Sequence, residues 1–219
     1  MAVNKEAYLH LTDELSKTNT TLVAVSKTKP ASDIEELYTL GQRDFGENYV
    51  QELVEKETQL PKDIRWHFIG HLQSNKVKYI APFVHLIHGV DSLSLLKEIN
   101  KQAAKHNRII NCLLQVHIAQ EETKFGFDIH ELNELNELSE LKNVAVVGFM
   151  GMASFTNDMQ KVRSEFKNLK EAFNKFEIRN SKFEILSMGM TADYKIAIEE
   201  GSTMVRIGSM LFGAREHNK

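Results

Sequence analysis

Residues 21–41, TLVAVSKTKPASDIEELYTLG, contain a short apolar run, a turn with two lysines and a segment with the periodicity of a helix. Val, Leu and Thr dominate the first residues, which is typical of a buried strand. The later part ends at Gly41, and glycine frequently follows the last turn of a helix. This stretch therefore predicts a strand that is followed by a helix.

The same order of a strand-like run and a helix-like segment occurs eight times along the chain. Continuous apolar strands joined by helices indicate a parallel sheet that is covered by helices. Eight such units predict an α/β fold, a closed (β/α)8 or TIM barrel. One of the predicted helices is DIHELNELNELSEL (128–141), with leucine at every third position. The runs that we interpret as strands are TLVAVSK (21–27), RDFGEN (43–48), RWHFIG (65–70), VHLIHGV (84–90), IINCLLQVHIA (109–119), NVAVVGFMGM (143–152), FEILSMG (183–189) and TMVRIG (203–208).

An open, doubly wound sheet is the alternative arrangement of the same units. That fold usually carries a G-x-G-x-x-G motif after its first strand, and no such motif follows the first predicted strand here. We therefore expect a single barrel domain over residues 1–219. An amphipathic segment before residue 21 predicts one additional helix at the front of the barrel.

The composition excludes several classes of protein. The chain has 219 residues, with 27 Lys and Arg against 30 Asp and Glu and a formal net charge of -3. This balance argues against a general nucleic-acid binder, which carries an excess of basic residues. No apolar run approaches the roughly 20 residues that cross a bilayer, and the single cysteine, Cys112, has no partner for an internal disulfide. We therefore expect a cytoplasmic protein without a membrane segment.

Two lysines follow the first predicted strand, where a barrel places its functional residues. Lys27 shares the alternation of Val23 and Val25, so its amine points into the barrel if those two side chains do. An ammonium group in such a place is desolvated, which lowers its pKa and makes the amine a nucleophile toward carbonyl groups. The alternative is a lysine at a strand end that turns out to water. Lys29 precedes Pro30, which requires an extended backbone and favours a loop position.

Small residues follow the last two predicted strands, as Ser187, Gly189, Gly208 and Ser209. Barrels often bind phosphate at this place through backbone N–H groups and the start of a short helix. Ordinary turn glycines are the alternative for each position taken singly. An inward amine opposite a phosphate site predicts a ligand with a carbonyl group and a phosphate. A sugar phosphate in a Schiff-base aldolase and pyridoxal 5′-phosphate both meet this description.

Arg206 lies in the eighth predicted strand, two residues before Gly208, and helps to separate these ligands. A guanidinium on this face can donate to a pyridine nitrogen while the glycine N–H meets a phosphate. Because arginine keeps its proton, the pyridine nitrogen stays unprotonated and the ring is a weak electron sink. Arg206 therefore favours pyridoxal phosphate as the cofactor.

Four segments together resemble the pyridoxal phosphate homeostasis protein family. They are VAVSKTKP, FGENYVQE, WHFIGHLQSNK and LSMGMTADYKIAIEEGSTMVRIGSMLFGAR, which lie in the family's order between Leu22 and Arg215. The resemblance implies a barrel similar to the N-terminal domain of alanine racemase. It also implies that pyridoxal phosphate is bound as a Schiff base on a lysine.

The resemblance gives roles to the residues that match the family's motifs. The first lysine of SKTKP is Lys27, to which the cofactor is attached. Arg206 is implied as the partner of the ring nitrogen, and Asn48 of the GEN motif lies beside the ring. Gly208 and Ser187 are implied as ligands of the phosphate.

The chain departs from the family's pattern after the sixth predicted strand, in GFMGMASF (148–155). Gly151 stands where relatives more often have Thr or Ala, and Ser154 stands where they have Pro. These changes affect the expected packing against the face of the cofactor rather than its attachment. Thr191 stands where Ser is common and keeps the hydroxyl group.

Three functions are compatible with this site. The first is a protein that holds pyridoxal phosphate, maintains vitamin B6 homeostasis and delivers the cofactor to apo-enzymes. The second is an amino-acid racemase, and the third is a class I aldolase-like enzyme that acts on a sugar phosphate. Racemases of the alanine type take a second base, a tyrosine, from another domain, whereas this chain ends at Lys219. We therefore expect a monomeric cofactor carrier without efficient catalysis.

The remaining histidines and one further lysine carry weaker signals. His67 and His71 are four residues apart at a strand end, but no HExxH helix contains them, so we expect no metal site. His85 and His88 flank an apolar strand, which is typical of hydrogen-bonded residues in the barrel wall. Lys124 follows the fifth predicted strand and is either a solvated lysine, the favoured interpretation, or an aid to cofactor transfer.

Overall fold

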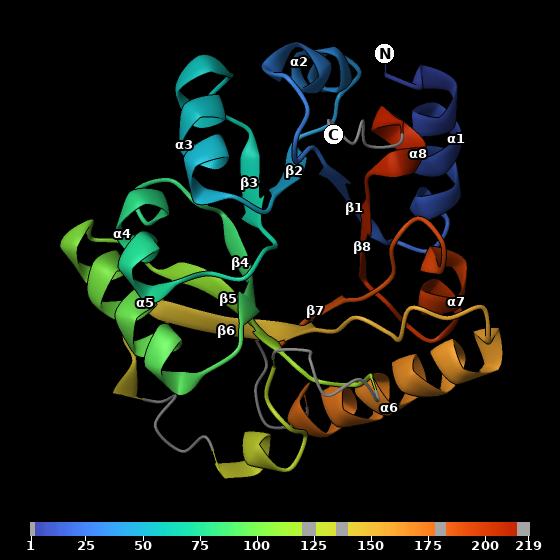
Figure 1. Ribbon diagram of the computed structural model, residues 1–219. Helices are drawn as coiled ribbons and strands as arrows, with labels where there is room; N and C mark the ends of the chain where they lie inside the picture. Colours follow the sequence, from blue (N-terminus) through green and yellow to red (C-terminus); the bar gives the residue numbers. More distant parts are fainter. Residues whose placement is uncertain (1–2, 120–125, 135–139, 178–182, 214–219) are drawn as a thin grey trace, which may run out of the picture.

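Eight parallel strands close into one barrel in the computed structural model (Figure 1). Neighbours in the sequence pair with one another, and β8 pairs with β1, so that Val23 lies opposite Arg206. The predicted (β/α)8 barrel is therefore confirmed. The structure describes residues 3–119, 126–134, 140–177 and 183–213. The strands are β1 (Thr21–Val25), β2 (Asp44–Glu47), β3 (Arg65–Phe68), β4 (Leu86–Val90), β5 (Ile110–Gln115), β6 (Val144–Met150), β7 (Ile185–Ser187) and β8 (Met204–Ile207).

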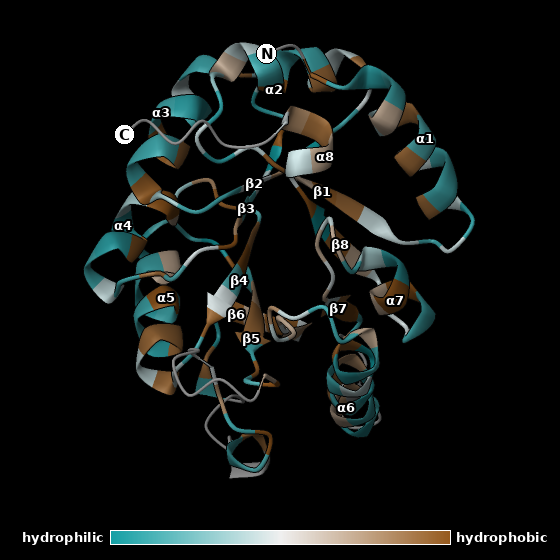
Figure 2. Cartoon of the chain, turned by 45° about the vertical axis from the view of Figure 1, so that its right-hand side comes forward, coloured by the Kyte–Doolittle hydropathy of each residue, from teal (hydrophilic) through white to brown (hydrophobic). Residues whose placement is uncertain are grey.

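Helices lie around the outside of the strands and cover the barrel (Figure 2). In the part of the chain that the structure describes, no helix combines the length and apolarity that a membrane span requires. The helices are α1 (Lys5–Ser16), α2 (Ala31–Thr39), α3 (Val50–Gln59), α4 (Val77–Ile80), α5 (Leu93–Lys105), α6 (Met159–Glu177), α7 (Tyr194–Glu199) and α8 (Ser209–Phe212), with 3-10 turns η1 (Ser74–Lys76) and η2 (Glu131–Glu134).

The N-terminal helix α1 fills a place in the ring of helices. The helix after the last strand, α8, has only four residues and covers little of the barrel wall. Helix α1 lies between α2 and α7 in Figure 2 and contacts both β1 and α8. Lys5 pairs with Glu36 of α2 at 2.7 Å, and Tyr194 of α7 donates to Glu14 at 3.1 Å. The additional helix predicted at the front of the chain is therefore present, and it completes the outer layer.

The segment 128–141 differs from the helix that its leucine spacing predicts. Its described part contains the 3-10 turn η2, and Leu135 and Leu138 lie outside the described residues. The N–H of His130 donates to Asp128 Oδ1 at 2.8 Å just before this turn. Local bonds of this kind between side chain and backbone compete with helix formation, which accounts for the difference in the described part.

Two apolar clusters form the core, one inside the barrel and one between the strands and the helices. Val23 belongs to the inner cluster, so the first strand has the orientation that its alternation predicts. Cys112 belongs to the outer cluster, where burial raises the pKa of its thiol. The inner cluster consists of Val23, Leu86, Leu113, Met150 and Met204, one from each of five strands.

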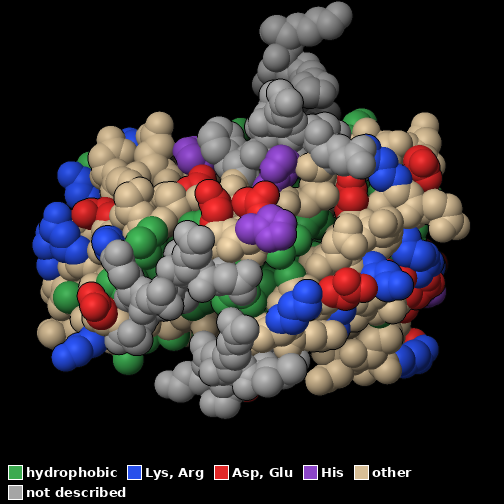
Figure 3. Space-filling view, turned by 90° about the horizontal axis from the view of Figure 1, so that it is seen from below, with side chains coloured by type: hydrophobic (Ala, Val, Ile, Leu, Met, Phe, Trp, Pro, Cys, Tyr) green, Lys and Arg blue, Asp and Glu red, His purple; other side chains and the backbone are tan. Residues whose placement is uncertain are grey.

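Charged side chains of both signs occur on the face shown in Figure 3. Lys and Arg side chains lie there in separate groups, with acidic side chains among them, rather than in one continuous basic patch. The distribution on this face agrees with the balanced charge of the whole chain.

Candidate cofactor site

Lys27 lies in the turn that follows β1, at the carboxyl end of the barrel. The Lys29 N–H donates to the Ser26 carbonyl at 3.1 Å, so Lys27 and Thr28 are the central residues of a four-residue turn. Thr28 has a φ of 64°, a conformation that β-branched residues rarely adopt. Lys27 itself is half-buried. The turn therefore presents this lysine from a strained backbone at the rim of the barrel.

The end of β8 lies against the end of β1. A Cβ atom at Gly208 would lie 3.2 Å from the carbonyl oxygen of Val25, so glycine allows the two strands to approach. Gly208 and Ser209 therefore share the rim with the Lys27 turn. The Ser209 hydroxyl donates to Thr191 Oγ1 at 3.2 Å. Two hydroxyl groups thus meet at the start of α8, whose first N–H groups have no acceptor within the helix.

Gly189 follows β7 and is buried. Its φ is 95°, and an added Cβ atom would lie 2.6 Å from the Cβ of Ala197 in α7. Its carbonyl accepts from the Arg206 N–H at 3.0 Å. The positive φ and the close approach of Ala197 explain why this position is a glycine. Contact of Gly189 with a phosphate stays a prediction.

Arg206 is buried inside the barrel, and part of its guanidinium is already bonded to the protein. Nη1 donates to the carbonyl and hydroxyl oxygens of Ser187 at 2.8 and 2.7 Å, and Nη2 donates to the Gly151 carbonyl at 3.1 Å. Of the five guanidinium N–H groups, three thus have acceptors among the described residues, and two remain for a ligand. Burial lowers the pKa of Arg206 to about 10, so the group keeps its charge at neutral pH.

Ser187 has partners that the sequence did not indicate. It is fully buried, and its Oγ lies 2.7 Å from Arg206 Nη1 and 3.1 Å from His88 Nδ1. A hydroxyl group has one hydrogen and two lone pairs, so these contacts leave Ser187 little capacity for a phosphate. Thr191, for which the sequence indicated only a retained hydroxyl, lies beside Ser209 at the rim.

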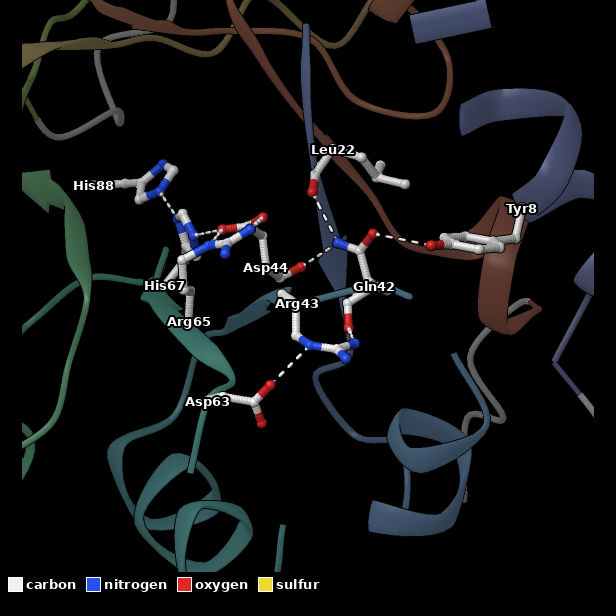
Figure 4. Close-up of polar contacts among 9 residues, drawn as sticks. All are labelled: Tyr8, Leu22, Gln42, Arg43, Asp44, Asp63, Arg65, His67 and His88. Carbon is white, nitrogen blue, oxygen red and sulfur yellow. Dashed lines mark hydrogen bonds and ion pairs between the residues drawn. The ribbon is translucent and has the colours of Figure 1, made fainter. Parts of the chain in front are cut away.

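A chain of buried hydrogen bonds continues from Ser187 to His88 and on through the barrel interior to Asp44. Figure 4 shows its part from His88 through His67 to Asp44. His88 Nε2 lies 2.9 Å from His67 Nδ1, and His67 Nε2 lies 3.0 Å from Asp44 Oδ1. An ionised carboxylate only accepts, so His67 donates to Asp44 through Nε2. We assign both histidines as neutral, so that His88 donates to His67 and Ser187 donates to His88. Ser187 Oγ then accepts from Arg206. We call these five residues the histidine chain, and in this assignment both histidines are neutral.

The charge at the far end of the histidine chain is fixed by Arg65. Its Nε lies 2.7 Å from Asp44 Oδ1, and its Nη2 lies 2.5 Å from Asp44 Oδ2 (Figure 4). Burial raises the pKa of Asp44, but hydrogen bonds from Arg65 and His67 outweigh it and lower the pKa to about 2. Burial lowers the pKa of His88 well below its usual value, which agrees with the neutral form.

His88 lies inside the barrel rather than in the wall, where the sequence pattern placed it. The alternation of His88 with Leu86, which belongs to the inner cluster, was the available signal for this orientation. His67 pairs with His88, whereas His71 Nδ1 lies 3.0 Å from Asp91 Oδ2. Within the described residues, no three His, Cys, Asp or Glu side chains form a group that could hold a metal ion.

Asn48 follows β2 on the same rim as the Lys27 turn. Its Oδ1 is buried and has no hydrogen-bond partner among the residues that the structure describes. Buried polar groups in proteins are nearly always hydrogen-bonded, so Asn48 Oδ1 is available to accept from a ligand or a water molecule. Together with the two remaining N–H groups of Arg206 and the backbone at Gly208, it fits a ring with polar substituents and a phosphate.

The departures after β6 face the helices. A Cβ atom at Gly151 would lie 2.5 Å from Leu169 Cδ2 in α6 and 3.0 Å from Ile118 Cδ1, so these side chains occupy the space. Ser154 is held by Glu165, whose carboxylate accepts from its N–H at 2.7 Å and from its hydroxyl at 2.6 Å. Gly151 and Ser154 therefore have local partners in the outer layer of the barrel.

The chain is similar to known proteins over most of its length. A family model described as alanine racemase, N-terminal domain, matches residues 5–216. A pyridoxal phosphate homeostasis protein of Aquifex aeolicus is 43% identical over 199 residues, which cover 90% of this chain and 87% of that protein.

Solved structures agree with this relationship. PipY of Synechococcus elongatus without pyridoxal phosphate is 36% identical with a TM-score of 0.88, and its form with pyridoxal phosphate bound is 34% identical with a TM-score of 0.86. Both comparisons cover 95% of this chain and 99% of PipY. An alanine racemase of Clostridium difficile, 15% identical with a TM-score of 0.77, covers 100% of this chain and 59% of the racemase and shows the shared fold alone. The resemblance inferred from the four motifs is confirmed, and the chain belongs to the pyridoxal phosphate homeostasis protein family, with the barrel of the alanine racemase N-terminal domain.

Proposed function

We propose that this protein binds pyridoxal 5′-phosphate as a Schiff base on Lys27 and keeps it available without efficient turnover of amino acids. One observation carries the proposal: the Lys27 turn, the buried Asn48 amide, Arg206 and the Gly208 rim meet at one end of one barrel. A structure of the relative PipY has pyridoxal phosphate bound, and curated relatives are named pyridoxal phosphate homeostasis proteins.

Each part of the site matches one part of the cofactor. Lys27 would hold the cofactor through its amine, by condensation with the aldehyde group and loss of one water. Arg206 donates an N–H group to the ring nitrogen, and Asn48 lies beside the ring. The phosphate is bound by the backbone and hydroxyl groups of Gly208, Ser209 and Thr191. Ser187, which the resemblance implied as a phosphate ligand, instead orients Arg206 through its hydroxyl and carbonyl oxygens.

Arg206, the member of the histidine chain that we place at the ring nitrogen, limits the chemistry of this site. Bound pyridoxal phosphate supplies an electron sink for carbanions, and the sink is strongest when the ring nitrogen is protonated. Here Arg206 keeps its proton because the pKa remains about 10 even after burial. The ring nitrogen then receives a hydrogen bond instead of a proton. A ring nitrogen that is hydrogen-bonded but not protonated makes the cofactor a weaker electron sink, which agrees with a carrier that turns over amino acids only slowly.

A carrier of this kind buffers the reactive aldehyde and passes it to apo-enzymes that depend on pyridoxal phosphate. We propose that it does so in the cytoplasm as a monomer, which size-exclusion chromatography with light scattering tests. Lys124, interpreted from the sequence as a solvated lysine with assistance in cofactor transfer as the alternative, lies outside the described residues, so its role stays a prediction.

The attachment is tested by borohydride reduction of the purified protein, followed by peptide mapping of the modified lysine. We expect the cofactor on Lys27 and loss of the visible absorption band in Lys27→Ala. The matched control is Lys29→Ala, two residues along the same turn, which should keep the band. Reduced cofactor on Lys29 alone in the wild-type protein would refute the assignment.

The carrier role is tested with the loaded protein in deuterated water with L-alanine and other amino acids. We expect only slow exchange of the Cα proton and no efficient inversion, because Lys27 serves one face of the cofactor. Racemisation above roughly 1 s⁻¹, an ordinary enzyme rate, would instead establish an amino-acid racemase.

A further inference from the structure

A buried ion cluster holds the Lys27 turn from the side of α3. Lys56 lies at its centre: Nζ donates to the Ser26 carbonyl at 2.9 Å and pairs with Glu47 Oε1 at 2.7 Å and Glu52 Oε1 at 2.6 Å. The Lys56 side chain is only 7% exposed, and lysine is rarely buried unless it is paired. We call Glu47, Glu52 and Lys56 the Lys56 cluster. Its contacts attach the backbone before Lys27 to a helix.

Glu52 holds the strained residue of the turn. Its Oε1 accepts from the Thr28 N–H at 2.6 Å. At a φ of 64° the side chain of Thr28 crowds its own backbone, which is why glycine or asparagine usually takes such a position. Without this acceptor, Thr28 gains more by relaxing toward negative φ. That rotation would move the neighbouring Lys27.

Glu47 connects the same cluster to the second rim residue. It is fully buried, accepts from the Ser26 hydroxyl at 2.7 Å and directly precedes Asn48. Burial raises the pKa of Glu47 to about 7, although Lys56 acts against this shift. The other carboxylate oxygen, Oε2, has no hydrogen-bond partner among the described residues. The Lys56 cluster therefore contacts both segments that carry the proposed cofactor ligands.

A cavity of about 440 Å³ lies between the Ser26–Lys29 turn and α3. Six of its eight lining residues are polar or charged, among them Thr28, Lys29, Glu52 and Lys56. Figure 1 shows α3 beside α2, the helix that begins directly after the turn. With a cavity instead of packed apolar side chains on this side, the hydrogen bonds from α3 determine the shape of the turn.

We propose that Glu52 and Lys56 are positioning residues for cofactor attachment, because they hold the Ser26–Lys29 turn in its strained form and so aim the Lys27 amine. Both act through the backbone of the turn rather than by contact with the cofactor. The proposal rests on the proposed attachment of pyridoxal phosphate to Lys27. It adds that contacts from outside the barrel are needed to keep Thr28 at its positive φ.

The first test compares Glu52→Ala with Glu55→Ala. Glu55 lines the same cavity from the same helix, is exposed and contacts Gln59 rather than the turn. We expect Glu52→Ala to weaken pyridoxal phosphate binding about tenfold, the effect of losing one charged hydrogen bond, and Glu55→Ala to leave it unchanged. Glu52→Gln, which keeps an acceptor for the Thr28 N–H, should retain most of the affinity. Equal affinity in all four proteins would overturn the proposal.

The second test asks whether relief of the strain replaces the anchor. Glycine at position 28 adopts a positive φ without crowding, so Thr28→Gly should restore most of the affinity that Glu52→Ala loses. A structural defect elsewhere in α3 would not respond to this change. A double variant that binds no better than Glu52→Ala contradicts the proposal.

A third measurement separates this inference from the proposed function. In the protein without cofactor, hydrogen exchange followed by NMR should show a protected Thr28 amide that loses its protection in Glu52→Ala and keeps it in Glu55→Ala. Unchanged protection in Glu52→Ala refutes the positioning role, whatever Lys27 binds. If the amide responds as expected while borohydride reduction attaches no cofactor to Lys27, the proposed attachment is wrong, although Glu52 does hold the turn.

Discussion

Arg206 and Lys27 lie at the same rim, but two different networks hold them. The histidine chain, which includes Arg206, crosses the barrel interior on side chains from five strands. Behind Lys27, the Lys56 cluster brings two carboxylates and one ammonium group together from β2 and α3. The histidine chain is a series of hydrogen bonds inside the barrel, whereas the Lys56 cluster is a group of charged side chains outside the ring of strands.

The difference indicates which property each network controls. The strands of a closed barrel are fixed by their neighbours, so a broken histidine chain leaves unpaired groups that cannot move apart to reach water. The Lys27 turn has a cavity behind it and can change shape when the Lys56 cluster is broken. We therefore expect the first network to affect the stability of the fold and the second to affect retention of the cofactor.

The largest effect on stability should come from His88→Leu. Leucine fills similar space but leaves Ser187 without the acceptor for its hydroxyl hydrogen and His67 without its donor. Each buried group left unpaired costs about 1–3 kcal/mol, so we expect the free energy of unfolding in urea to fall by about 2–4 kcal/mol. The cofactor should also bind more weakly, because Ser187 no longer fixes Arg206.

The control for this variant is His71→Leu, which changes an exposed histidine four residues from His67. Its free energy of unfolding should stay within about 0.5 kcal/mol of the wild-type value. If His88→Leu behaves in the same way, the histidine chain contributes no support and the contrast between the two networks fails.

The two networks should also give opposite dependence of stability on pH. The pKa of Glu47 is raised to about 7, so the folded state binds its proton more tightly, and the contribution of Glu47 to stability is lost as the pH rises from about 5 to 7. The lowered pKa of His88 acts in the opposite direction, so each contribution is read from the difference between the wild-type protein and the variant. The pKa of Asp44 is lowered to about 2, so its contribution is present above pH 4 and is lost as the pH falls toward 2. Each slope is at most about 1.4 kcal/mol per pH unit.

Urea unfolding at a series of pH values measures both slopes. Glu47→Gln should remove the contribution of Glu47 between pH 5 and 7, where Lys56, Glu52 and Ser26 face this carboxyl group. Asp44→Asn should leave that contribution unchanged and remove the loss at acidic pH. A wild-type slope between pH 5 and 7 in Glu47→Gln means that Glu47 does not carry the proton.

The sequence predicts the barrel well because every unit repeats the same local pattern, and no single contact decides the fold. It places Lys27, Asn48 and Gly208 at the rim for the same reason, since strand ends are visible in the pattern. The histidine chain is different: His88 and Ser187 are 99 residues apart and meet only across the closed barrel.

The Lys56 cluster was missed for a related reason. Lys56 shares the buried stripe of α3 with Val50 and Leu53, but a lysine is rarely buried unless it is paired, and its partners at the Ser26–Lys29 turn are not visible in the sequence. The same limit explains why the contacts of Ser187 with Arg206 and His88 were missed, because a motif gives the position of a hydroxyl group along the chain but not its direction. Contact of Ser187 with the phosphate stays a prediction.

The smallest effect should separate the hydroxyl group of Ser187, which the resemblance implied as a phosphate ligand, from that of Thr191, which we propose as one. If Thr191 binds the phosphate, Thr191→Ala removes one neutral hydrogen bond, worth about 1 kcal/mol, and weakens pyridoxal phosphate about fivefold. It should weaken pyridoxal phosphate but not pyridoxal, which lacks the phosphate. Ser187→Ala should weaken both ligands by a similar factor, because Ser187 acts on the ring through Arg206. Absorption titrations with the two ligands measure both ratios. If Ser187→Ala selectively weakens the phosphorylated ligand, then the serine turns toward the phosphate in the loaded protein, and the histidine chain ends at His88.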